Sequence, residues 1–64
     1  MYKNLLAEMS RSGVSKEDIA KCLGLAGSTI WARFRGEPAF TVVEAVKIKN
    51  EFFPNLTLDY LFDT

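Results

Sequence analysis

The sequence predicts an all-α fold, a compact bundle of about five short helices. Apolar residues recur at spacings of three and four residues, and capping residues, glycines and prolines separate the segments that carry them. No segment alternates polar and apolar residues convincingly or carries an Asn-Gly hairpin turn. The chain has 64 residues, 48% of them hydrophobic, so we expect a single folded domain over residues 1–64 with a small core.

The first two helices have clear ends. Residues 2–12 are expected to form the first helix, which Gly13 ends in a left-handed conformation. Ser15 is a favourable N-cap for the second helix, with Asp18 at the third helical position of a capping box, and Gly24 ends this helix. The residues expected to be buried are Tyr2, Leu5, Leu6 and Met9 from the first helix, and Ile19, Ala20 and Leu23 from the second.

A third helix is expected over about residues 27–35, after a very short connection. Ile30 and Phe34 lie four residues apart and face inward, while the small side chain of Ala20 lets the third helix cross the second closely. Two helices joined by so tight a turn cross steeply, and the later one presents a face outward. We therefore predict a helix-turn-helix over about residues 15–36, the arrangement that lays its second helix in the DNA major groove.

Two more helices complete the predicted bundle. Thr41 and Glu44 form a capping box, and Pro54 blocks the continuation of the helix that starts there. Thr57, with Asp59 in the following turn, opens a short last helix. The residues expected to face inward are Val42, Ala45, Ile48 and Phe52 from the fourth helix, and Leu58, Leu61 and Phe62 from the fifth.

Charge is unevenly distributed along the chain, although the formal net charge is zero. Residues 1–36 carry six basic and three acidic side chains, a net of +3, whereas residues 37–64 carry two basic and five acidic ones, a net of −3. Any surface that faces an anion is therefore expected in the first half of the chain.

Several functional classes are disfavoured by composition. The single Cys22 allows no disulfide framework within the chain and is expected to be an unreactive small residue, and the absence of histidine argues against zinc. No phosphate-binding glycine motif or metal cluster is present, so we expect no enzyme, no cofactor and no small-molecule ligand. No signal peptide or membrane-length apolar run occurs, so a cytoplasmic location without membrane contact is expected.

The stretch from Ser15 to Gly36 carries a family resemblance. It reads S-K-E-D-I-A-K-C-L-G-L-A-G-S-T-I-W-A-R-F-R-G and resembles the phage Cro and repressor type of helix-turn-helix regulator, whose pattern is Thr or Ser, Gln-Glu-x-Leu-Ala, Leu-Gly, Ser-x-x-Thr-Ile and a closing Gly. The later segments F-T-x-x-E-A-x-x-I-K, F-F-P and L-x-x-L-F look like the tail of small Gram-positive phage regulators, so the resemblance covers nearly the whole chain.

The resemblance implies a lambda repressor-like DNA-binding domain that regulates transcription in a bacterial host cell. Such a protein binds a short, roughly palindromic operator in double-stranded DNA as a dimer, so a weak homodimer is expected, at least on DNA. The family positions that contact bases map onto Gly27, Ser28, Trp31 and Ala32. Phosphate contacts map onto Lys16 and are also expected from Arg35, with Arg33 a weaker candidate and Thr29 mainly structural but able to bind a phosphate.

The chain departs from the family pattern on the face that would read bases. Ala26 supplies no side-chain cap, Gly27 no long hydrogen-bond donor, and Ala32 only a methyl group. Sequence readout would therefore depend on Ser28, Thr29, Trp31 and DNA shape, or else specific affinity is low. Trp31 lies about 100° around the helix from Ile30, which favours a partly exposed tryptophan over a core one.

The sequence leaves alternatives open. The leading hypothesis is a sequence-specific, Cro-like repressor, favoured over a full-length lysogenic repressor because no inducer or cleavage domain follows; an isolated DNA-binding domain would look the same. The alternative is a protein-interaction module with weak or non-specific DNA binding, which the near-zero net charge and the Gly27/Ala32 face support. In that case Lys16, Arg33 and Arg35 are solvated charges, and Ser28 only caps the start of the third helix and satisfies its backbone groups. Tyr60, or an edge of Phe53 or Phe62, is a candidate for the dimer interface.

Overall fold

Within the part of the chain that the structure describes, every regular element is a helix. A computed structural model describes residues 1–63, and these contain no strand. The helices are α1 (Lys3–Ser12), α2 (Lys16–Leu23), α3 (Gly27–Arg35), α4 (Val42–Phe52) and α5 (Leu58–Leu61). The all-α prediction is confirmed, with helix boundaries within a residue or so of those expected. None of these helices is long and apolar enough to cross a membrane.

Several helices begin or end at the capping residues and glycines that the sequence predicts. Ser15 and Thr41 each accept a hydrogen bond from the third helical residue, whose carboxylate accepts one from the backbone of the cap, so both predicted capping boxes are present. Gly13, Gly24 and Gly36 end α1, α2 and α3 with φ of 70°, 68° and 79°, the left-handed region that glycine adopts without a steric penalty.

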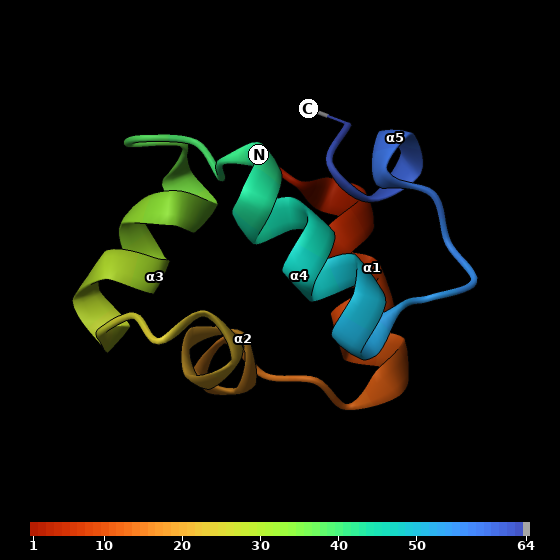
Figure 1. Ribbon diagram of the computed structural model, residues 1–64, viewed down its shortest axis with the longest axis horizontal. Helices are drawn as coiled ribbons and strands as arrows, with labels where there is room; N and C mark the ends of the chain where they lie inside the picture. The colour runs from red at the N-terminus through yellow and green to blue at the C-terminus, as the bar shows by residue number, and fades with distance from the viewer. Residues whose placement is uncertain (64) are drawn as a thin grey trace.

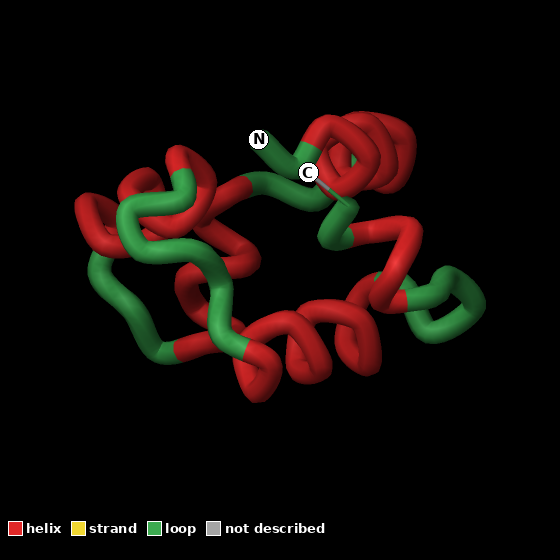
Figure 2. The backbone as a smooth tube through the Cα atoms, turned by 90° about the horizontal axis from the view of Figure 1, so that it is seen from above, coloured by secondary structure: helices red, strands yellow, loops and turns green. Residues whose placement is uncertain are grey.

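The helices surround one small core, within dimensions of 27 × 21 × 20 Å. In Figure 1, α3 and α5 lie towards opposite ends of the long axis with α4 between them, and Figure 2 shows the same arrangement from above. Helix α4 packs against α2 and α5, α1 packs against α5, and α3 packs against α2. The buried residues are Tyr2, Leu5, Met9, Ile19, Ala20, Ile30, Phe34, Ile48, Phe53 and Leu61.

An aromatic cluster closes the core between the N-terminus, α3 and α5. The ring of Tyr2 meets those of Phe34, Phe40 and Phe62 edge to face, with centroids 5.2–6.4 Å apart. The Tyr2 hydroxyl also accepts a hydrogen bond from the Phe40 backbone N–H at 3.2 Å. Tyr2 immediately precedes α1 in a left-handed conformation, so it enters the core from the chain end and not from the helical stripe that the sequence suggests.

Two expectations about burial were wrong. Val42 was expected to face inward, but it is 77% exposed, because it lies on the rim of an open groove that Tyr2, Phe40 and Phe62 also line and no other element covers it. Leu6 lies at the edge of the stripe on α1 and is likewise exposed. Of the candidates for a dimer interface, Phe53 is buried, Phe62 is half-buried and Tyr60 is exposed.

Candidate nucleic-acid interface

Three residues, 24–26, connect α2 to α3. Gly24 donates its N–H to the carbonyls of Ala20 and Lys21, and the N–H of Leu25 bonds to the Ala20 carbonyl at 2.9 Å. Ala20 is itself buried, and α3 packs against α2. The short turn thus joins two helices that pack directly against each other.

Helix α3 has a buried face and an open one. Ile30 and Phe34 are buried, whereas Trp31, on the adjoining face, is 54% exposed, in agreement with the predicted exposure. Of the other residues proposed to contact DNA from this helix, Gly27, Ser28 and Arg35 are exposed, and Thr29, Ala32 and Arg33 are half-buried.

The start of α3 is open to solvent. Its N-cap, Ala26, forms no side-chain capping bond, as expected for alanine. The first N–H groups of a helix have no partner within the helix, and here they belong to residues at the exposed end of α3. Gly27 has no atom within 4 Å of where a Cβ would stand, so its missing side chain leaves free space on this surface.

Lys16 connects the start of α2 to the open face of α3. Its ammonium nitrogen lies 3.6 Å from the centroid of the Trp31 ring and 5.2 Å from that of Phe34. A cation at this distance over an indole face is attracted by the negative ring face. The two residues that the sequence proposed separately for phosphate and base contact are therefore neighbours on one surface.

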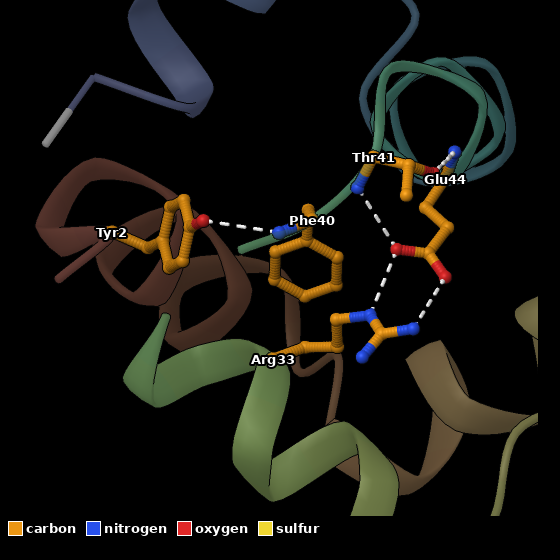
Figure 3. A network of polar contacts seen from close by, with 5 residues as sticks. All are labelled: Tyr2, Arg33, Phe40, Thr41 and Glu44. Atoms are coloured by element: carbon orange, nitrogen blue, oxygen red, sulfur yellow. Dashed lines mark hydrogen bonds and ion pairs between the residues drawn. The ribbon is translucent and has the colours of Figure 1, made fainter. Parts of the chain in front are cut away.

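Arg33 turns away from this surface and pairs with Glu44 at the start of α4. Its Nε and Nη2 donate to the two carboxylate oxygens of Glu44 at 3.0 and 3.4 Å, as Figure 3 shows. The same carboxylate accepts the Thr41 N–H of the capping box at 3.0 Å. Partial burial by itself raises the pKa of Glu44, but the hydrogen bonds from Arg33 and Thr41 outweigh it, so the pKa lies below its ordinary value.

Arg35 pairs with Glu37 just beyond the end of α3, but loosely. The Nε to Oε1 distance is 3.2 Å, and both side chains are largely exposed. An exposed pair of this kind contributes about 0–1 kcal/mol, so a stronger anion can displace Glu37. Arg35 therefore remains available to a phosphate, unlike the half-buried Arg33.

Acidic groups flank the start of α2. Hydrogen bonds from the backbone and the side chain of Ser15 lower the pKa of Asp18 below its ordinary value, so this carboxylate is ionised at neutral pH. Glu17 lies beside it and is exposed. The positive potential of Lys16 is thus partly offset, and the surface as a whole is only weakly basic.

Comparisons with family models, with curated proteins and with solved structures give no match to this chain. Within residues 1–63, no group of three or more carboxylate or thiol side chains is arranged to hold a metal ion.

Sequence reasoning missed the partners of Lys16 and Arg33. Both residues were interpreted either as DNA contacts or as solvated charges, whereas each has an aromatic or acidic neighbour within the fold. Glu44 offered one signal, because it follows Thr41 at capping-box spacing and could be placed at a helix start. Nothing in the spacing shows that this helix start meets Arg33.

Proposed function

We propose that this chain is a sequence-specific DNA-binding transcriptional regulator, a Cro-like repressor that lays α3 in the major groove of an operator. One observation carries the proposal: Ile30 and Phe34 anchor α3 in the core while the flank with Ser28, Trp31 and Arg35 stays open. A helix with one face packed in the core, and with its N-terminus and one flank exposed, can insert into a groove about 12 Å wide.

Each open residue would have a distinct role. Ser28 and the N–H groups at the start of α3 would approach base edges or a phosphate, and Arg35 would exchange Glu37 for the flanking backbone. Trp31 would place its exposed edge against sugars and thymine methyl groups while Lys16 covers its face and reaches a phosphate. With Gly27 and Ala32 beside them, much of the specificity would come from shape and apolar contact.

Repression in this proposal is steric. Two copies bound to the halves of a roughly palindromic operator would block polymerase, and the two-fold symmetry of the site would match that of the dimer. The dimer is expected to be weak without DNA.

Selection of binding sites from random duplexes tests the proposal. We expect a short enriched half-site, bound at least about a thousandfold more tightly than random DNA. Arg35→Ala should weaken binding to all duplexes about equally and reduce the salt dependence, whereas Trp31→Ala should change the preferred bases. Lys47→Ala is the matched control, because this lysine is exposed on α4 beside Cys22 and should leave binding nearly unchanged.

A second candidate function follows from the pairing of the basic residues. Arg33 and Arg35 already have carboxylate partners, and Lys16 lies over Trp31, so few unpaired cations face outward near α3. This observation favours a protein-interaction module that retains only weak DNA binding. Selection that enriches no half-site, together with weak and strongly salt-dependent binding to any duplex, would favour this second function over the first.

A further inference from the structure

Arg33 and Arg35 lie two residues apart on α3 but occupy different environments. The side chain of Arg33 is 17% exposed and that of its partner Glu44 is 16% exposed, whereas the pair formed by Arg35 is open to solvent. A guanidinium that binds both oxygens of one carboxylate is geometrically specific, because its donors form a rigid planar fork.

The carboxylate of Glu44 is held from two directions. As the third residue of α4, it accepts the Thr41 N–H through Oε1, the same oxygen that accepts the Arg33 Nε at 3.0 Å. The capping box therefore orients the carboxylate, and Arg33 binds an acceptor that is already in place. Figure 3 shows Arg33 reaching from α3 to the first turn of α4.

This ion pair spans two helices whose backbones stay apart. No Cα atom of α3 lies within 8 Å of one in α4, and α3 packs directly against α2. The later half of α3 is held to the rest of the fold through side chains, namely Phe34 in the aromatic cluster and Arg33 on Glu44. The pair thus constrains the angle of α3 independently of its crossing with α2.

We propose that Arg33 is a positioning residue, which acts through Glu44 to set the angle at which α3 enters DNA and which makes no phosphate contact itself. The inference rests on the proposed function. The angle matters here because two of the residues that would read bases are short: Ser28 has one side-chain torsion and Ala32 has none, so neither can follow a base edge if the helix tilts.

Two substitutions separate positioning from direct contact. Arg33→Met keeps much of the apolar stem and removes the charge, and Glu44→Gln preserves a capping-box residue while removing the anion that Arg33 binds. Each should lower affinity for the selected operator about tenfold, and the double variant should be no worse than either alone. Arg33→Lys should bind the operator little better than Arg33→Met, because an ammonium group cannot form the two hydrogen bonds that a planar guanidinium donates to one carboxylate.

The salt dependence of operator affinity distinguishes the two roles. Loss of a phosphate contact would change it, whereas loss of a positioning interaction would leave it unchanged. For Arg33→Met, the slope of log K against log salt should equal that of wild type, whereas Arg35→Ala on the same helix should reduce it by about 0.9. All measurements are made at a temperature at which circular dichroism shows each variant to be folded. A reduced slope for Arg33→Met, or wild-type operator affinity for Glu44→Gln, would overturn the inference.

A measurement without DNA separates this inference from the proposed function. The unfolding free energies of wild type, both single variants and the double variant should show coupling between Arg33 and Glu44. Coupling without an enriched half-site would overturn the proposed function, and with it the role of Arg33 on DNA. An enriched half-site without coupling would overturn the inference alone.

Discussion

The ammonium group of Lys16 lies 3.6 Å from the centre of the Trp31 ring and connects the first residue of α2 to the exposed flank of α3. The contact covers one ring face of a tryptophan that is otherwise 54% exposed. It therefore removes that ring face from contact with a partner, while the rest of the exposed indole stays accessible.

A double-mutant cycle should detect the Lys16–Trp31 contact. Lys16→Met alone should be nearly neutral, because losing the cation–π attraction is offset by removing a positive charge from a helix N-terminus. The cycle with Trp31→Leu isolates the pair, and we expect a coupling of about 0.5–1 kcal/mol in urea unfolding followed by circular dichroism. A coupling of zero would mean that the two side chains do not interact in solution.

Enlarging Ala20 should separate α2 from α3. Ala20→Leu places three extra carbon atoms at a buried position of α2 and should lower the unfolding free energy by about 1–3 kcal/mol. Ala7→Leu is the matched control, since Ala7 is an exposed residue of α1 and its replacement should change stability by no more than about 0.5 kcal/mol. Equal effects of the two substitutions would contradict close packing at Ala20.

Acid should destabilise the protein through its two capping boxes. The pKa values of Asp18 and Glu44 lie below their ordinary values of 3.8 and 4.5, so the unfolded chain binds more protons than the folded one in this range. Their stabilising contribution is complete above the ordinary values and is lost as pH falls through the lowered folded-state values.

Unfolding measured at about pH 6 and about pH 3 tests this linkage. Asp18→Asn and Glu44→Gln should each lose less stability over this interval than wild type. Glu17→Gln serves as the control, because Glu17 is exposed and lies outside the capping box. A loss in Asp18→Asn or Glu44→Gln as large as in wild type would show that the corresponding carboxylate is not held as described.

Charge at Val42 should be tolerated. This residue is 77% exposed at the first position of α4, so Val42→Asp loses little burial and adds a negative charge near the helix N-terminus. The unfolding free energy should stay the same or rise by up to about 1 kcal/mol. Ile48→Ala, on the buried face of the same helix, should instead lose about 2–5 kcal/mol. Chemical denaturation measures the unfolding free energy of both variants. A loss for Val42→Asp as large as that for Ile48→Ala would place Val42 in the core.

The ends of the helices were predictable because the interactions that form them are local. Ser15 with Asp18, and Thr41 with Glu44, satisfy the first backbone groups of α2 and α4 over three residues. The spacing of Ile30 and Phe34 likewise predicted which side of α3 is buried.

Tertiary structure alone decided what lies next to these elements. Arg33 meets Glu44 across 11 positions, and the Tyr2 hydroxyl meets Phe40 across 38, so no periodicity or cap reveals either contact. Val42 has the spacing of a core residue, yet the other elements leave it uncovered. The local sequence determines whether a segment forms a helix and which side of that helix is apolar, because both properties depend on residues that are neighbours in the sequence. Whether a side chain on that helix is buried, paired or free depends on which distant segments pack against it.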